Sequence, residues 1–154
     1  MTSDRSAPAP TVAVQRKLRA ARTHCATRGA QFTAQRAEVL ELLLLRGGQA
    51  KAYDLQDDMQ ARHGRIAPTT VYRALEFLQA HHLVHKVDAA NTFVVCDHAE
   101  HDHPALLLIC PRCGAVEERH DTGPAEPFLA HLRGQGYAPQ AIEVKALCAG
   151  CRAG

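Results

Sequence analysis

Two Cys-x-x-Cys pairs constrain this chain more than any other feature. The first pair is Cys110 and Cys113, the second is Cys148 and Cys151, and 34 residues separate them. Four thiolates in two such pairs are typical of a tetrahedral structural zinc site, in which protein ligands fill every position. The alternatives are two disulfides or four buried thiols, and no feature of the sequence indicates an oxidising compartment. The spacing therefore predicts a zinc-stabilised unit in the last third of the chain.

Length and composition set the broad class. The chain has 154 residues, of which 46% are hydrophobic, which fits one sizeable domain or two small ones. The longest purely aliphatic run, Leu42–Leu45, is too short to span a bilayer, and the N-terminus lacks the apolar stretch of a signal peptide. We therefore expect a cytoplasmic protein without a membrane partner, in which the cysteines bind metal.

Charge is distributed unevenly along the chain. Residues 1–90 carry 13 Lys and Arg against 8 Asp and Glu, whereas residues 91–154 carry 5 against 8. A basic first part joined to an acidic, cysteine-rich second part suggests a nucleic-acid-binding module followed by a sensing or assembly module. An ordinary solvated surface remains the alternative, because charge alone does not exclude it.

The first part of the chain has a helical pattern. Residues 1–12 are polar, contain two prolines and are predicted to form a flexible tail. Thr33 is a candidate N-cap, and glycines follow the first two helical stretches. Apolar residues at helical spacing predict four helices: Val14–Arg28, Thr33–Leu45, Ala52–Ala61 and Pro68–His81.

The fourth of these helices has the clearest pattern. Pro68 suits a first turn, and apolar residues recur at the spacing of one buried face, at Val71, Ala74, Leu75 and Leu78. The opposite face then presents small polar groups, a phenol and a guanidinium, as a helix that reads the major groove does. An ordinary surface helix is the alternative. The side chains that would make these contacts are Thr69, Thr70, Tyr72 and Arg73.

Strands follow the helices. Leu83–Asp88 and Thr92–Asp97 predict a hairpin, and helices followed by a hairpin are the order of a winged helix-turn-helix. The remaining elements are predicted as strands Ala105–Ile109 and Ala115–His120, a helix Pro124–Arg133 and a final strand within Tyr137–Leu147. The expected fold is therefore α+β, with a winged-helix domain over residues 1–97 and a connector with a small zinc-stapled α/β domain over residues 98–154.

A second metal site is suggested by the pairing of this hairpin. If its loop has an even number of residues, His85 lies opposite Val94 and shares a face with Cys96 as a diagonal neighbour, about 7 Å away. One ion could then bridge the two side chains, and His103 and Glu118 are candidates for the remaining ligands. A histidine on an apolar face is more commonly a satisfied core residue, which is the alternative reading.

The motifs together resemble a known family. The stretches Phe32–Arg36, Pro68–Leu75, Val84–Val87 and Cys110–Val116, followed by the second cysteine pair, resemble the ferric uptake regulator family, and most of all its zinc-responsive members. The resemblance runs from about Val14 to Cys151, with the motifs in the same order. It implies a homodimeric transcription regulator rather than an enzyme, with an N-terminal winged helix and a C-terminal α/β dimerisation domain.

The resemblance also implies partners and sites. The expected partner is double-stranded operator DNA, bound by a metal-loaded homodimer that takes no small-molecule substrate and represses zinc-uptake genes. Two zinc ions per chain are implied, a structural one on the four paired cysteines and a regulatory one on His85, Cys96, His103 and Glu118. His98 and His101 are additional donors beyond the pattern of the family, and either could replace His103 or bind a third ion weakly. The DNA contacts fall on Tyr72 and Arg73, with Thr33 and Arg36 as lesser candidates.

Four alternatives are open at this point. A thiolate ligand favours zinc over iron or manganese, but an iron- or peroxide-responsive member of the family is the nearest competitor. A zinc hydrolase would need an open coordination position, which Cys96 would close, and the sequence has no HExxH motif. A thiol oxidoreductase would need a reactive pair at a helix N-terminus, whereas both pairs are expected to flank strands. The last alternative is a zinc-stabilised DNA-binding protein without sensing.

Overall fold

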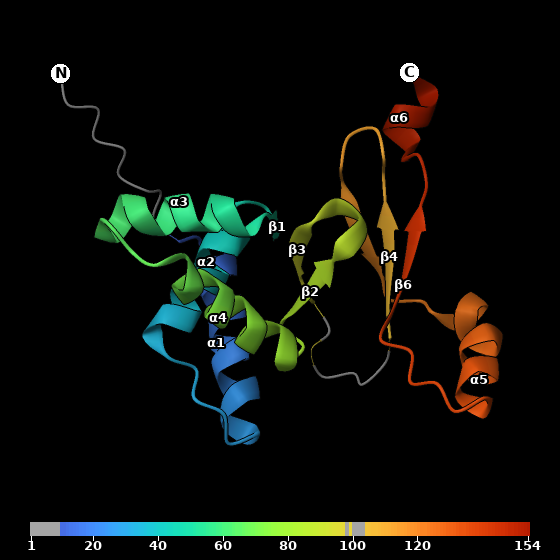
Figure 1. Cartoon of the computed structure of the whole chain (residues 1–154), viewed down its shortest axis with the longest axis horizontal. Coiled ribbons are helices and arrows are strands. Elements are labelled where there is room, and N and C mark those ends of the chain that lie inside the picture. Colours follow the sequence, from blue (N-terminus) through green and yellow to red (C-terminus); the bar gives the residue numbers. More distant parts are fainter. Residues whose placement is uncertain (1–9, 98, 100–103) are drawn as a thin grey trace.

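The computed structural model describes residues 10–97, 99 and 104–154. Its first part is helical and leads into a small sheet, and a second sheet with two further helices follows (Figure 1). None of the helices in these ranges is both long and apolar enough to cross a bilayer. The elements of the first part are α1 Val12–Thr27, α2 Ala34–Leu45, β1 Gln49–Ala50, α3 Ala52–His63, α4 Pro68–Ala80, β2 Val84–Val87, η1 Asp88–Ala90 and β3 Thr92–Val95.

Local signals explain where these helices begin and end. The side chain of Thr33 accepts a hydrogen bond from the backbone N–H of Arg36, so the predicted N-cap of α2 is confirmed. Thr11 caps α1 in the same way, so α1 begins at Val12, two residues before the predicted start. Gly29, just after α1, has φ +66°, a conformation that glycine adopts without steric cost. Pro68 occupies the first turn of α4, as predicted.

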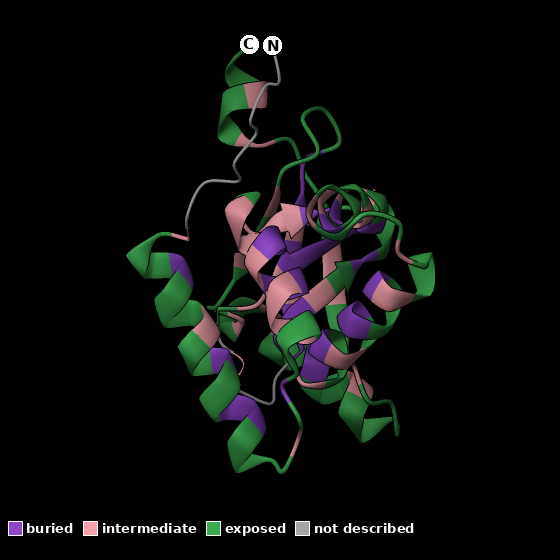
Figure 2. Ribbon diagram, turned by 90° about the vertical axis from the view of Figure 1, so that its left-hand side faces the viewer, coloured by how far each residue is buried: buried purple, intermediate pink, exposed green. Residues whose placement is uncertain are grey.

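The helices enclose one hydrophobic core. All four apolar residues predicted for the inner face of α4 are buried, and Leu55 and Met59 of α3 pack into the same core as Val39 and Leu43 of α2. Buried positions accordingly concentrate on the inward faces of the helices (Figure 2). Burial of side chains of this size stabilises the fold by roughly 1.5–3 kcal/mol each, which holds α4 in place with its other face outward.

The first sheet has the strand order β1-β3-β2. In the hairpin, Val87 pairs with Thr92 and His85 with Val94, which is the predicted register. The N–H of Cys96 also donates to the carbonyl of Leu83 at 2.9 Å, which continues the pairing beyond β3. Sequence analysis missed β1, since a strand of two residues shows no alternation.

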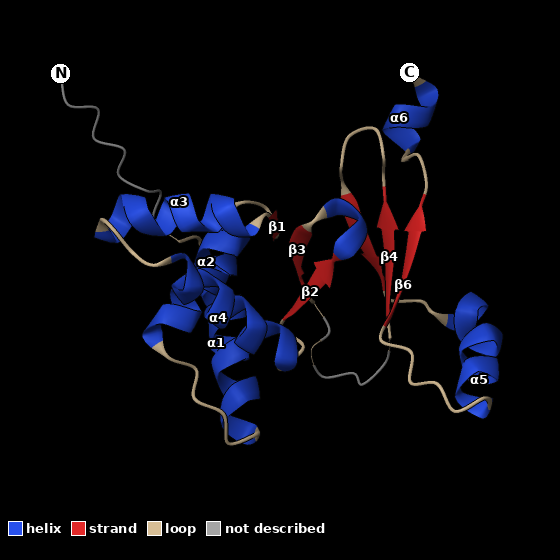
Figure 3. Cartoon of the chain, viewed as in Figure 1, coloured by secondary structure: helices blue, strands red, loops and turns tan. Residues whose placement is uncertain are grey.

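The second sheet has the order β5-β4-β6, in which β4 pairs antiparallel with β5 and parallel with β6 (Figure 3). The strand β6 lies within the predicted range Tyr137–Leu147, whereas the five-residue helix α6 was not predicted. The elements of this part are β4 Ala105–Ile109, β5 Val116–Arg119, η2 Gly123–Ala125, α5 Glu126–Gly134, β6 Ala141–Lys145 and α6 Ala149–Ala153.

The two sheets pack against each other through a second hydrophobic cluster. Alternate residues of β4, Ala105, Leu107 and Ile109, are buried and meet Val87 and Val94 of the first sheet. The predicted α+β class with a winged helix is therefore confirmed. The face of β4 that carries Leu107 is the face turned toward the first sheet, and this orientation decides which side chains of the neighbouring strands can reach across.

Candidate metal sites and nucleic-acid interface

The four paired cysteines form one cluster. Cys110 directly follows β4, and Cys148 precedes α6, so the parallel pairing of β4 with β6 brings the two pairs to the same end of the sheet. One ligand atom from each of the four cysteines lies within 4.8 Å of the others. The Sγ atoms of Cys113 and Cys148 are 3.9 Å apart, much longer than the disulfide bond length of about 2.05 Å.

The electrostatics of this cluster fit a cation. The backbone N–H of Cys148 donates to Sγ of Cys110 at 3.5 Å, and such backbone hydrogen bonds lower the pKa of Cys110 to about 6. Hydrogen bonds with the neighbouring sulfurs, Cys148 first, raise the pKa of Cys151 to about 12, because thiolates so close together repel one another. A divalent cation removes this conflict, and a tetrahedral set of four sulfurs is a donor set that zinc prefers.

One argument of the sequence analysis was wrong here. Cys148 is the N-cap residue of α6, so the second pair does lie at a helix N-terminus, the position expected of a redox-active pair. The sequence around it gave little sign of a helix of only five residues. The oxidoreductase alternative is weakened by a different observation, namely that all four sulfurs converge on one point, which suits a metal rather than one exchanging pair.

His85, Cys96 and Glu118 form the second cluster, which we call the three-residue cluster. One ligand atom from each lies within 4.8 Å of the others. Nε2 of His85 is 3.1 Å from Oε1 of Glu118, and Sγ of Cys96 lies 3.6 Å from the same oxygen. The register of the hairpin puts His85 and Cys96 on one face, as the sequence predicted.

Glu118 reaches this cluster from the other sheet. It pairs with Leu107 across β5 and β4, and paired residues of neighbouring strands project from the same face. Since Leu107 faces the first sheet, Glu118 does too, whereas its neighbours Glu117 and Arg119 are exposed. The three-residue cluster thus takes two side chains from the first sheet and its vicinity and one from the second.

Burial and charge in the three-residue cluster also fit a metal. Burial lowers the pKa of His85, but hydrogen bonds and charge from Cys96 and Glu118 outweigh it and raise that pKa to about 9. Burial raises the pKa of Glu118, yet the contact with His85 leaves it below its ordinary value. The other carboxylate oxygen of Glu118, Oε2, is buried and has no hydrogen-bond partner among the described residues. An acceptor left without a donor costs free energy that a cation would recover.

Part of the predicted ligand set lies outside the described residues. His103 is one of these positions, as are His98 and His101, so the fourth ligand remains a prediction. The three ligands that the structure describes come together as the sequence suggested.

The exposed face of α4 carries the predicted nucleic-acid contacts. Thr69, Tyr72 and Arg73 are exposed, with Tyr72 at 53%, and Thr70 is half-buried. Tyr53 in the first turn of α3 is equally prominent, at 59% exposed, and lines the same hollow as Tyr72. Sequence analysis did not single out Tyr53, although a tyrosine two residues after a lysine at a helix start is the signal that could have indicated it.

Thr33 and Arg36 have mainly internal contacts. The hydroxyl of Thr33 caps α2, while the guanidinium of Arg36 stacks 3.7 Å from the ring centroid of Phe77 in α4. Arg36 also donates to the backbone carbonyl of Gln31. The stacking of Arg36 on Phe77 joins α2 to α4, the other contacts are local to the start of α2, and any contact with DNA would be additional to them.

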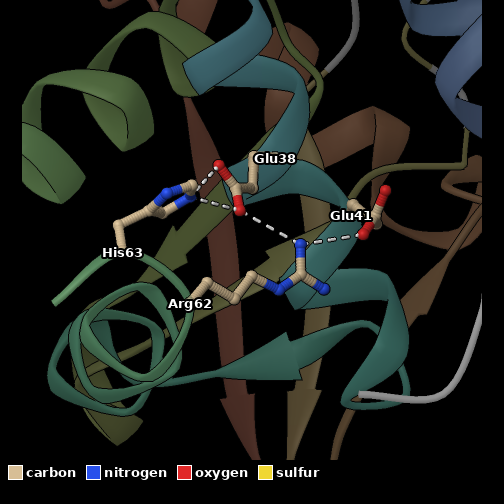
Figure 4. Close-up of polar contacts among 4 residues, drawn as sticks. All are labelled: Glu38, Glu41, Arg62 and His63. Carbon is tan, nitrogen blue, oxygen red and sulfur yellow. Dashed lines mark hydrogen bonds and ion pairs between the residues drawn. The ribbon is translucent and has the colours of Figure 1, made fainter. Parts of the chain in front are cut away.

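A polar network fixes the end of α3 before the chain turns into α4. Nη1 of Arg62 lies 3.1 Å from Glu38 and 3.0 Å from Glu41, and Nε2 of His63 contacts both carboxylate oxygens of Glu38 at 2.8 Å (Figure 4). Both glutamates belong to α2, so the network ties the last turn of α3 to α2. It thereby limits how far the short connection to α4 can move.

Comparisons with known proteins agree with this geometry. Residues 27–145 match the model of the Ferric uptake regulator family. The chain is 39% identical over 140 residues to the "Zinc uptake regulation protein" of Escherichia coli (strain K12), which covers 89% of this chain and 82% of that protein. It is 28% identical over 129 residues to the protein of the same description from Mycobacterium tuberculosis (strain ATCC 25618 / H37Rv), covering 80% and 96%.

Solved structures resemble the fold to different degrees. A "Zinc Uptake Regulator Complexed With Zinc AND DNA" is 37% identical and matches with a TM-score of 0.82 over 93% of this chain and 97% of that one. Holo XcZur, 40% identical, matches with a TM-score of 0.75 over 89% and 97% of the two chains. Apo XcZur, at 38% identity and similar coverage, matches with only 0.52.

Proposed function

Because the chain belongs to the ferric uptake regulator family, we propose that it is a zinc-responsive transcription regulator that represses zinc-uptake genes. In this proposal a metal-loaded homodimer binds operator DNA. Residues 1–97 form the DNA-binding domain, and residues 98–154 form the connector and the dimerisation domain. The relatives described as zinc uptake regulation proteins, and the neighbour complexed with zinc and DNA, support this assignment.

The observation that carries the proposal is the position of the three-residue cluster. His85 and Cys96 lie on the wing side, whereas Glu118 projects from the second sheet. Their ligand atoms are within reach of one ion only when the two sheets keep this relative position. A metal ion bound here would therefore fix the angle between the DNA-binding helix and the second sheet.

The chain would bind two zinc ions. The four-cysteine cluster would hold the structural zinc, and His85, Cys96 and Glu118, with His103 as the fourth ligand, would hold the regulatory zinc. A zinc ion held there would accept electron pairs from imidazole, thiolate and carboxylate alike. The thiolate of Cys96 favours zinc over ferrous iron or manganese, which prefer sites of histidine and carboxylate.

The residues of the chain then perform the switch. His85 and Cys96 move with the wing, and Glu118 moves with the second sheet, so ligation by all of them selects one arrangement from several. The arrangement seen here lies closer to holo XcZur than to apo XcZur, which supports two distinct arrangements in this family. Metal and DNA that favour the same arrangement must strengthen each other's binding equally.

Exposed apolar side chains on the second part support a homodimer. Phe128 on α5, Tyr137 after it, and Val144 and Leu147 near β6 are all exposed, between 39% and 65%. In the strand order of the second sheet β6 lies at an edge, where its backbone can pair or pack with a second copy. Two copies would present two α4 helices to successive major grooves of DNA. The contacts in each groove would come from Thr69, Thr70, Tyr72 and Arg73.

The proposal is tested by operator binding over a series of buffered zinc concentrations. A gel shift with DNA from upstream of a zinc-uptake operon should show binding that rises over a narrow range of free zinc. Binding that rises with ferrous iron and not with zinc would instead indicate an iron-responsive regulator. Full binding after removal of the exchangeable zinc would contradict the proposed mechanism, since the angle between the sheets would then not depend on metal.

A further inference from the structure

Two polar side chains connect the two sheets independently of the metal ligands. Gln49 of β1 reaches the loop that carries the first cysteine pair, and Glu143 of β6 reaches the tip of the wing. Both connections exist alongside the buried contacts of Val87 and Leu107. The described residues therefore hold the sheets together at several points besides the three-residue cluster.

Gln49 uses both groups of its side-chain amide. Its Nε2 donates to the carbonyl of Gly114 at 2.8 Å, and its Oε1 accepts from the N–H of Val116 at 3.1 Å. The side-chain amide of Gln49 thereby bonds to the backbone at the start of β5 in the way that a neighbouring strand would. Gly114 directly follows Cys113, so this contact links the first sheet to the edge of the four-cysteine cluster.

Glu143 makes a matching pair of contacts on the other side of Leu107. It pairs with Leu107 across β6 and β4, and so projects toward the first sheet, as Glu118 does from β5. Its two carboxylate oxygens accept the N–H groups of Asp88 and Ala89 at 3.0 and 3.2 Å. These N–H groups begin η1, where no preceding carbonyl of the same helix can serve them.

The two glutamates on either side of Leu107 have different roles in this geometry. Glu118 contacts a histidine and a cysteine and keeps one buried oxygen without a described partner, whereas both oxygens of Glu143 are occupied by backbone donors. Glu143 is thus satisfied without a metal. It can hold the wing against the second sheet whether or not the three-residue cluster is loaded.

We propose that Gln49 and Glu143 are positioning residues that set the free zinc concentration at which this regulator responds. This inference rests on the proposed function and adds its regulation. The contacts of both side chains raise the fraction of metal-free chains that already have the ligands of the three-residue cluster together. The apparent dissociation constant of a site equals its intrinsic value divided by that fraction, so a larger fraction makes the site tighter.

The expected effect is a shift in zinc affinity without loss of the site. Each neutral hydrogen bond of Gln49 contributes a factor of about 5, and each hydrogen bond to the carboxylate of Glu143 contributes more, so losing either pair should weaken zinc binding by about 10-fold or more. Gln49→Ala and Glu143→Ala should each show this shift. Glu143→Gln, which keeps one acceptor oxygen and the size of the side chain, should show a smaller one.

The test measures competition between the protein and a chromophoric chelator for Zn²⁺ itself, without DNA. Glu117→Gln is the matched control, because it removes the same charge from β5 but is exposed and contacts Arg119 instead of the first sheet. Hydrogen exchange of the Asp88 and Ala89 amides in the metal-free protein gives a second readout. Glu143→Ala should speed this exchange, while the control should leave it unchanged.

The outcomes separate this inference from the proposed function. Weaker binding of the second zinc in Gln49→Ala and Glu143→Ala, with an unchanged control and intact structural zinc, would support it. If these variants bind the second zinc as tightly as the wild type, or if the control weakens it equally, the inference is overturned and the proposed function stands. A wild-type chain that binds only one zinc would overturn both. If an alanine variant fails to fold, the inference is tested with Glu143→Gln instead. Its zinc affinity and the exchange of its Asp88 and Ala89 amides are then compared with those of the wild type.

Discussion

The two metal clusters of this chain differ in what they join. The four cysteines all follow β4 or β6 and lie at one end of one sheet, so their ligation closes a single unit. The three-residue cluster takes His85 and Cys96 from the wing side and Glu118 from the second sheet. A metal ion in the four-cysteine cluster would therefore stabilise one part of the molecule, while an ion in the three-residue cluster would fix the relation between two parts.

This difference predicts that one cluster governs the stability of the fold and that the other governs the response to metal. A metal held inside one unit contributes its binding free energy to the folding of that unit and gives no signal while the unit is folded. A metal held between units that are each folded contributes to their relative position, and its loss leaves both intact. The following substitutions test this division, from the largest expected effect to the smallest.

Loss of one of the paired cysteines should have the largest effect. Structural zinc contributes apparent binding free energies of about 10–16 kcal/mol in zinc-finger peptides, comparable with the whole stability of a small domain. Cys148→Ser should therefore lose the structural zinc and unfold the second part, which metal analysis and circular dichroism would detect. Cys25→Ala is the control, because Cys25 is fully buried in the helical core and belongs to neither cluster. A Cys148→Ser dimer that folds without the structural zinc would contradict the role of the four-cysteine cluster in stability.

Loss of a ligand from the three-residue cluster should shift the response to much higher zinc concentrations and leave the fold intact. Substitution of a residue that only hydrogen-bonds to a metal ligand already costs about 10–100-fold in metal affinity, so loss of a ligand in Cys96→Ser should weaken binding of the second zinc by more than about 100-fold. Its structural zinc and its circular dichroism spectrum should match those of the wild type. Operator binding should then need correspondingly more free zinc. If Cys96→Ser kept normal zinc-dependent binding, the result would favour a zinc-stabilised DNA-binding protein without sensing, in which His85 and Cys96 are merely buried.

Sequence analysis correctly predicted the features that short-range patterns determine. The inner face of α4, the cap at Thr33 and the pairing of His85 with Val94 follow from periodicity, hydrogen-bonding chemistry and loop parity. The cysteine pairs are equally local, because each pair is defined by its own spacing. These features need no knowledge of how the two sheets meet.

Features that depend on packing between distant segments were beyond the sequence. The two-residue strand β1 forms only because β3 is beside it, and the roles of Gln49 and Glu143 exist only once the sheets face each other. Glu118 was named as a candidate ligand, yet nothing local distinguishes it from Glu117. The register of β5 against Leu107 makes that distinction. The contacts of Arg36 with Phe77 are of the same non-local kind.

Arg73 lies in neither cluster and should change DNA affinity alone. A bidentate contact between arginine and a base is worth about 1–3 kcal/mol, so Arg73→Ala should weaken operator binding by about 5- to 150-fold at every zinc concentration. The zinc midpoint measured without DNA should stay unchanged. Arg133→Ala removes the same charge from α5, where an exposed ion pair with Glu126 contributes little, and serves as the control. An Arg73→Ala variant with a shifted zinc midpoint in the absence of DNA would place this helix within the metal-linked network.

The smallest effect is expected at the ion pair between α1 and the end of the wing. Nζ of Lys17 lies 2.7 Å from Oδ1 of Asp97, the residue after Cys96, and both side chains are about half exposed. Exposed pairs of this kind contribute about 0.2–1 kcal/mol and are screened by salt. Lys17→Ala should therefore lower the free energy of unfolding by at most about 1 kcal/mol, less at high salt, and leave the zinc midpoint within about 2-fold of the wild type. A larger shift in the midpoint, measured by the same chelator competition, would mean that α1 also helps to position Cys96, and that metal binding is linked to three parts of the molecule rather than two.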